Sequence, residues 1–423
     1  MCQPSVLRFF SVRRKAFAIL SLAIAACAPD AGVVDMAVLQ WNPDTGVYEL
    51  REARLTTLED VAALRGAAAM PIGDAEIVIE GGRLANVSTE QQFRDAVLDN
   101  PGRPVEAQFV DQGGVLYPAD FHSLNLATAY YNFEQARTYA LARGLSPEKL
   151  RGVPFYYFPT VQVFGGSSGR QVDNAAWFPL LRSFLLYPFD RLQDVPLAMN
   201  QGVVAHEYGH GLFNAEVFDG AWIPGYLGVW CTEEPCEDER GIRMIGILEE
   251  GFADAWGVGV TGDPRFMRHS FFDDGDVRNP SGFFAPRHCS SQAAFEEKIQ
   301  QTRRLSRADS DAKWGEWEYQ FGTVLAGALY RAGQDAGYDR VMDALLASYR
   351  ASGPTSLGAI VEEDPTGATI GNFATVARAV IGAAPDTPTQ RALCAAWIDR
   401  LALDPADLGP LCDGVVPNGE CGR

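Results

Sequence analysis

The stretch that most constrains the fold is residues 203–213, VVAHEYGHGLF, because it holds two histidines four residues apart in a chain with only five histidines. In a helix, residues four apart lie on one face, so His206 and His210 can direct a ring nitrogen at the same metal ion. Glu207 would then face the open coordination position, where a carboxylate can take a proton from metal-bound water. The pattern HExxH therefore predicts a zinc-binding helix, and a chance arrangement on a buried helix is the alternative.

A second pair of polar residues at helical spacing lies downstream, in residues 247–257, ILEEGFADAWG. Glu250 and Asp254 are four apart, so one carboxylate can reach a metal ion while the other hydrogen-bonds the far nitrogen of a ligand histidine. Glu249 is an alternative ligand, but only Glu250 has an aspartate at this spacing. Apolar residues surround both carboxylates, which argues against a solvated acidic face. The segment therefore predicts a second helix that completes the metal site.

A third short segment, DNAAW at residues 173–177, precedes both helices. The three motifs, in this order, resemble those of the thermolysin-like zinc metallopeptidases of the gluzincin type, including the fungalysin group. The resemblance covers roughly residues 119–335 and implies a zincin-like catalytic domain that cleaves peptide bonds with a zinc-activated water. It assigns His206, His210 and Glu250 as zinc ligands, Glu207 as the general base, Asp254 as the partner of a ligand histidine, and Asn174 and Ala175 as edge-strand residues that bind the substrate backbone.

The chain departs from the family pattern at two places. The segment between His210 and Glu250 is longer than usual and contains CTEEPCEDER, which a disulfide-pinned insertion near the cleft would explain. The family also supplies a downstream histidine that stabilises the oxyanion, whereas the corresponding segment here, EWEYQFGTVLAGALYRAG, carries Tyr319. A tyrosine hydroxyl can donate a hydrogen bond to an oxyanion, and losing one such donor typically costs about 10²–10³ in rate. We therefore expect Tyr319 to be a catalytic residue.

Another zinc-binding arrangement places the third ligand close to the second histidine. Glu216 lies six residues after His210, where another branch of zinc peptidases has that ligand. Those enzymes need a glycine three residues after the second histidine to turn the chain, and this chain has Phe213 there. The sequence therefore favours Glu250 over Glu216.

The first 26 residues have the features of a secretory signal. They carry four basic residues and no acid, and they include the apolar run AFAILSLAIAA, which is shorter than the roughly 20 residues of a membrane-spanning helix. The last three residues of this run and the next residue, Cys27, form the sequence IAAC, which resembles the bacterial lipobox, in which the cysteine is lipidated and becomes the new N-terminus. Ordinary signal cleavage beside an incidental cysteine is the alternative. The lipobox predicts an envelope protein tethered to a membrane by acyl chains on Cys27, and Ala28 favours the outer membrane.

Six of the eight cysteines lie after Cys27, in a chain that the signal would route to an oxidising compartment, which favours disulfides. The short loops CTEEPC and CDGVVPNGEC suggest two local pairs. The expected pairings are Cys231 with Cys236, Cys412 with Cys421, and Cys289 with Cys394. A zinc knuckle is the alternative, but the first loop has no matching second pair or histidines nearby.

The chain as a whole is expected to adopt an α+β fold in two lobes, with the catalytic cleft between them. Residues 27–118 contain strand-like runs and one helical stretch, and they predict a small α+β N-terminal unit with a packing, shielding or partner-binding role. Residues 119–262 carry the motifs and predict the zinc-binding catalytic lobe, and residues 263–423 predict a mostly helical C-terminal lobe. The acidic turn with Asp273, Asp274 and Asp276 is a candidate calcium site or a solvated turn.

Charge and motifs together narrow the function class. The formal net charge of −19 argues against nucleic acid as a partner. We expect zinc-dependent hydrolysis of a peptide or protein substrate, by an endopeptidase because nothing in the sequence suggests a site for a free terminus. The alternatives are a surface binding protein that keeps the zinc fold but has lost efficient turnover, and a structural envelope protein without metal.

Overall fold

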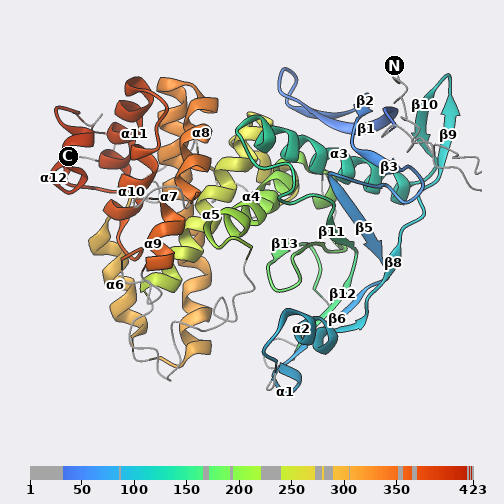
Figure 1. Ribbon diagram of the computed structural model, residues 1–423, viewed down its shortest axis with the longest axis horizontal. Helices are drawn as coiled ribbons and strands as arrows, with labels where there is room; N and C mark the ends of the chain where they lie inside the picture. Colours follow the sequence, from blue (N-terminus) through green and yellow to red (C-terminus); the bar gives the residue numbers. More distant parts are fainter. Residues whose placement is uncertain are drawn as a thin grey trace, which may run out of the picture.

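The computed structural model describes residues 32–84, 87–164, 171–190, 194–220, 240–271, 279–280, 289–303, 305–350, 356–363, 369–416, 419 and 421. Strands occur only in the first half of this described chain, and its part after residue 262 contains helices and no strands. The prediction of a mixed α+β fold with a helical C-terminal region is therefore confirmed. In Figure 1 these C-terminal helices gather on one side of the molecule and the sheets on the other.

The sheets combine strands that are distant in the sequence. The strands are β1 (Val34–Asn42), β2 (Val47–Leu55), β3 (Leu58–Asp60), β4 (Arg65–Gly66), β5 (Ala69–Gly73), β6 (Glu76–Glu80), β7 (Leu98–Asn100), β8 (Arg103–Pro104), β9 (Phe109–Gln112), β10 (Val115–Pro118), β11 (Val153–Tyr157), β12 (Thr160–Phe164), β13 (Ala175–Phe178) and β14 (Ser183–Leu186). Their sheets have the orders β2-β1-β10-β9, β13-β14-β11-β5-β8, β12-β6-β7 and β3-β4. The edge strand β13 runs antiparallel to β14.

Two parallel pairings join the predicted N-terminal unit to the predicted catalytic lobe. Strand β5 pairs with β11, and β6 pairs with β12. Parallel neighbours need a long crossover between them, and the chain that links each pair includes the helix α3 (Phe121–Ala142). The described parts of residues 27–118 and 119–262 therefore share two of the four sheets.

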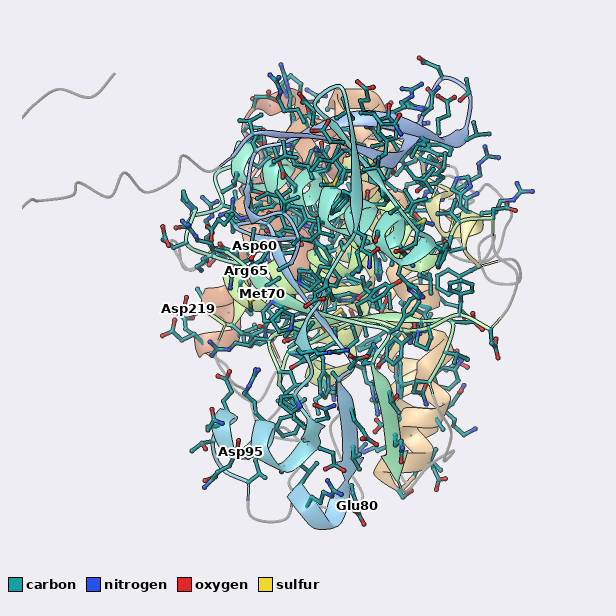
Figure 2. The ribbon with its side chains drawn as sticks, turned by 90° about the vertical axis from the view of Figure 1, so that its right-hand side faces the viewer. Asp60, Arg65, Met70, Glu80, Asp95 and Asp219 are labelled. Atoms are coloured by element: carbon teal, nitrogen blue, oxygen red, sulfur yellow. A yellow bond between two sulfur atoms is a disulfide. The ribbon has the colours of Figure 1, made fainter. Side chains whose placement is uncertain are left out.

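The small three-stranded sheet projects from the rest of the strands. Ile77 of β6 and Phe93 of α2 (Glu90–Val97) belong to a separate buried cluster on this layer. Figure 2 shows Glu80 and Asp95 on the same layer, at a distance from Asp60 on the β3–β4 hairpin. The same cluster includes Tyr156 of β11 and Leu185 of β14, so the projecting layer packs against the five-stranded sheet through a cluster that is separate from the one containing the zinc-motif helices.

Four helices pack in succession from the sheet to the C-terminal side. The helix α4 (Gln201–Val217) contacts α5 (Arg240–Thr261), α5 contacts α7 (Arg307–Ala336), and α7 contacts α11 (Thr387–Arg400). The other helices are α1 (Gly81–Leu84), α6 (Gln292–Thr302), α8 (Tyr338–Tyr349), α9 (Leu357–Glu363), α10 (Phe373–Gly382) and α12 (Pro405–Leu408), with 3₁₀ turns at Leu197–Met199, Phe266–His269 and Gly409–Cys412. The helices α4 and α5 lie in the middle of Figure 1.

Glycines allow α4, α5 and α7 to approach closely. A Cβ atom added at Gly209 of α4 would lie 2.8 Å from the Cα atom of Ala253. A Cβ atom added at Gly251 of α5 would lie 2.6 Å from the carbonyl oxygen of Gly322 on α7. Such distances are too short for real Cβ atoms, so the packing of these three helices depends on glycine at both positions.

The N-terminal hairpin contacts the start of α4. The Tyr48 hydroxyl donates to Asn200 Oδ1 at 3.0 Å and accepts from the Gln201 N–H at 2.9 Å. Asn200 is the N-cap of α4, and its side chain accepts from the N–H groups of Gly202 and Val203. Strand β2 therefore supports the cap of the helix that carries the HExxH motif.

The C-terminal disulfides differ from the predicted pairings. Cys394 is bonded to Cys412, and Cys289 is bonded to Cys421, so the predicted Cys412–Cys421 and Cys289–Cys394 pairs are wrong. The physical reason is the packing around α11, which contacts the turn Gly409–Cys412. In addition, the Ser290 N–H donates to the carbonyl of Arg400, and the Cys421 N–H donates to the Asp399 side chain. These contacts place Cys289 beside Cys421, whereas closeness in sequence had suggested another partner.

Several predicted features lie outside the described residues. They are the signal segment with Cys27, the Cys231–Cys236 pair, and the acidic turn with Asp273, Asp274 and Asp276. Among the helices that the structure describes, none has the length and apolar character needed to cross a bilayer.

Candidate metal centre

The helices α4 and α5 bring three potential metal ligands together. His206 Nε2 lies 3.1 Å from His210 Nε2 and 3.6 Å from Glu250 Oε2, and His210 Nε2 lies 3.8 Å from Glu250 Oε1. One ligand atom from each of these residues lies within 4.8 Å of the others. Two imidazole nitrogens and a carboxylate facing one point form a group that could hold a metal ion.

A buried carboxylate orients the first histidine. Asp254 Oδ1 lies 3.0 Å from His206 Nδ1, and the aspartate is only 1% exposed. A carboxylate this close to Nδ1 favours a proton on that nitrogen and leaves the Nε2 lone pair directed toward His210 and Glu250. Asp254 therefore prepares His206 to act as a metal ligand through Nε2.

Glu207 lies between the histidines and the edge strand of the five-stranded sheet. Its Oε2 accepts a hydrogen bond of 2.7 Å from the backbone N–H of Trp177, and its Oε1 lies 4.0 Å from His206 Nε2. The residue is 5% exposed and lines the same cavity as the metal-binding group. A carboxylate held in this way can exchange a proton with water bound beside the histidines.

The edge strand β13 also contributes to the cavity wall. Asn174 and Ala175 line the cavity, as the resemblance implied, and β14 pairs with only one side of β13. However, the Ala175 N–H already donates to Asn174 Oδ1 at 2.9 Å, and the Trp177 N–H donates to Glu207. A peptide that pairs with this strand must therefore displace the Asn174 side chain or use the strand's carbonyl groups.

The structure places most of the predicted site residues around one cavity of about 220 Å³. Its lining includes Asn174, Ala175, His206, Glu207, His210, Glu249, Glu250 and Tyr319. Tyr319 of α7 also lines the cavity, and its side chain is 42% exposed. Asp254 lies behind the cavity wall, against His206.

Glu216 is not part of this cavity lining. Its Oε2 lies 3.5 Å from Lys149 Nζ and 3.8 Å from Arg350 Nε, and the residue is 9% exposed. The carboxylate thus has two cationic neighbours on a different side of α4. This geometry speaks against the alternative in which Glu216 is the third metal ligand.

Two further acidic residues lie next to the site: Glu249, which the sequence suggested only as an alternative ligand, and Glu318, to which the sequence assigned no role. Burial, and then the negative charges of Glu250 and Glu318, raise the pKa of Glu249 well above its usual range. Burial also raises the pKa of Glu318 to about 7, although Arg243 at 3.3 Å opposes the shift. Glu318 directly precedes Tyr319, so its position in the sequence was the available signal. Nothing in the local pattern showed that Glu249 would be buried.

Comparison with known proteins adds nothing to the assignment of the metal-binding group. No protein-family model matches the chain, and no curated protein gives a significant match. The assignment of a possible metal site therefore rests on the residues and their geometry alone.

Proposed function

We propose that the protein is a zinc-dependent endopeptidase that hydrolyses peptide bonds with a metal-activated water. The observation that carries this proposal is the convergence of His206, His210 and Glu250 with Glu207 in one cavity. Two imidazoles and one carboxylate form a donor set typical of catalytic zinc sites, which keep a further position for water or substrate. Bound zinc supplies Lewis acidity toward water and toward a substrate carbonyl.

Each residue of the cavity has a separate task in this proposal. Glu207, held by the Trp177 N–H, takes the proton from the attacking water and passes it to the leaving nitrogen. Tyr319 donates a hydrogen bond to the carbonyl oxygen as negative charge develops there. The edge of β13 that no described strand covers aligns the peptide, and an edge strand favours cleavage within a chain because it holds residues on both sides of the bond.

Two observations favour a second candidate, a zinc-binding surface protein with weak turnover. The side chain of Tyr319 is 42% exposed rather than enclosed in the cavity. In addition, the N–H groups of Ala175 and Trp177 have partners already. In either case we propose that the protein is exported and attached to the cell envelope by a lipid on Cys27, as its lipobox-like sequence suggests.

The test combines zinc analysis of the purified protein with cleavage of a diverse peptide library. Glu207→Gln should retain the metal and lose cleavage, because an amide cannot accept the proton. Glu216→Gln is a matched control on the same helix, since it removes one carboxylate outside the cavity, and it should retain both zinc and cleavage.

The possible outcomes separate the alternatives. Bound zinc without cleavage in the wild-type protein would favour the binding-protein candidate. Absence of zinc under metal-replete conditions would refute both candidates. Loss of zinc in Glu216→Gln with unchanged stability would reinstate the other ligand arrangement.

A further inference from the structure

Glu249 is unusual among the acidic residues around the metal centre. It lines the cavity that contains the metal-binding group, and it is only 8% exposed. Within the part of the chain that the structure describes, its carboxylate has no ion-pair or hydrogen-bond partner. A buried carboxylate without a partner is costly, and native proteins seldom keep one without compensation.

The neighbouring carboxylates all have partners of their own. Glu207 accepts from the Trp177 N–H, Asp254 contacts His206, and Glu318 contacts Arg243. Glu250 faces the two histidines and would share the charge of a bound metal ion. A divalent ion at this position therefore leaves Glu249 as the cavity carboxyl without a cationic partner, and a cation placed beside it would favour its charged form.

The rest of the cavity indicates the kind of group that would supply this charge. Apolar side chains from Val203, Met267 and Phe271 line the same cavity as Glu249. A side chain with an apolar stem and a cationic end can cover such a surface and place its charge against a carboxylate. Lysine and arginine have this form, whereas a shorter or wholly apolar side chain would leave Glu249 unpaired.

We infer that Glu249 selects substrates with a lysine or arginine side chain next to the scissile bond. This inference rests on the proposed peptidase function, because it assigns the substrate class of the same cavity. Glu249 is a specificity residue in this role: it binds the substrate side chain and takes no part in the proton transfers of Glu207.

The experiment compares peptides that differ by a single charge. The starting point is a peptide that the zinc-loaded protein cleaves. At each position flanking the cleaved bond, we compare lysine with the neutral norleucine and arginine with the neutral citrulline. At one of these positions the basic peptide should have a kcat/KM higher by roughly 10- to 100-fold, the range expected for a hydrogen-bonded charge pair in a buried pocket.

Glu249→Gln should remove this preference, because the kcat/KM of the basic peptide should fall to that of its neutral counterpart in the same variant. Glu297→Gln is the matched control, because it removes one exposed carboxylate on α6, outside the cavity lining, and its preference should equal that of the wild type. A wild-type protein without the basic preference, or a preference that survives in Glu249→Gln, would overturn the inference and leave the peptidase proposal intact.

If the protein binds zinc without cleaving peptides, the role of Glu249 can be tested by the equilibrium binding of two small zinc-binding compounds. Lysine hydroxamate and norleucine hydroxamate share a zinc-binding group and a stem, and they differ in the terminal ammonium. The wild-type protein should bind the lysine compound more tightly, and Glu249→Gln should bind both equally. Equal binding by the wild-type protein would overturn the inference, and failure to take up zinc would overturn the proposed function together with it.

Discussion

The contact between Asp254 and His206 gives the sharpest test of the metal centre. Asp254→Asn keeps the size of the side chain and therefore opens no cavity, but it removes the negative charge that stabilises the Nδ1–H of His206. The aspartate is almost fully buried, and the two atoms are 3.0 Å apart, so solvent cannot replace the lost interaction. We expect weaker zinc binding because His206 becomes a less basic and less well oriented ligand.

The expected magnitude follows from the position of Asp254 behind a single ligand. Loss of such an outer partner typically lowers metal affinity by about 10- to 100-fold. This corresponds to roughly 1.4–2.7 kcal/mol of zinc-binding free energy, since a factor of ten equals about 1.4 kcal/mol. Removal of a ligand itself, as in His210→Ala, should abolish stoichiometric binding.

The assay is a zinc competition titration against a chelating indicator, with thermal unfolding measured in parallel. Asp263→Asn provides a closely matched control, because Asp263 is also buried and its Oδ2 lies 2.9 Å from His269 Nε2, in a pair outside the metal cavity. That variant should keep the zinc affinity of the wild type. Equal zinc affinities for wild type and Asp254→Asn would refute the idea that Asp254 orients a zinc ligand.

Three further changes test other parts of the structure. Tyr319→Phe should lower kcat by about 10²-fold with little change in KM, because the hydroxyl acts on the developing oxyanion; equal losses in binding and turnover would contradict this role. Gly209→Ala should lower stability by about 1–3 kcal/mol through overpacking against α5 and weaken zinc binding, whereas Gly315→Ala, with open space around it, should do neither. Peptide mapping of the oxidised protein should find Cys394 linked to Cys412, and a fragment joining Cys412 to Cys421 would show this pairing to be wrong. Cys394→Ser should reduce the free energy of unfolding by about 3 kcal/mol, the value expected for a disulfide that closes a loop of this length.

The geometry of the candidate site was predictable where it depends on a single helix. His206 and His210 are one turn apart on α4, and Glu250 and Asp254 are one turn apart on α5. Helical periodicity alone places each pair on one face. The apolar residues around both pairs indicated that the faces are buried, and a buried face with histidines and carboxylates implies mutual contact.

Contacts between distant segments were much harder to predict. The separation of α4 and α5 depends on Gly209 fitting against Ala253, and the motif spacing contains no information about that fit. Likewise, the partner of Cys289 depends on how the chain around residue 290 meets the end of α11. A short loop between two cysteines favours their pairing by entropy, but here the packing of α11 selects the more distant partners.

In the segment before residue 119, too, the local structure was predictable and the contacts with distant segments were not. Its alternating pattern correctly indicated strands, yet a strand pattern does not reveal which sheet a strand will join. In the structure β5 lies between β11 and β8, and Tyr48 reaches the cap of α4. Removal of this segment would take an inner strand from the sheet that ends in β13 and would expose the cap of the zinc-motif helix. All the metal-site motifs lie after residue 119, but the scaffold that positions them begins much earlier in the chain.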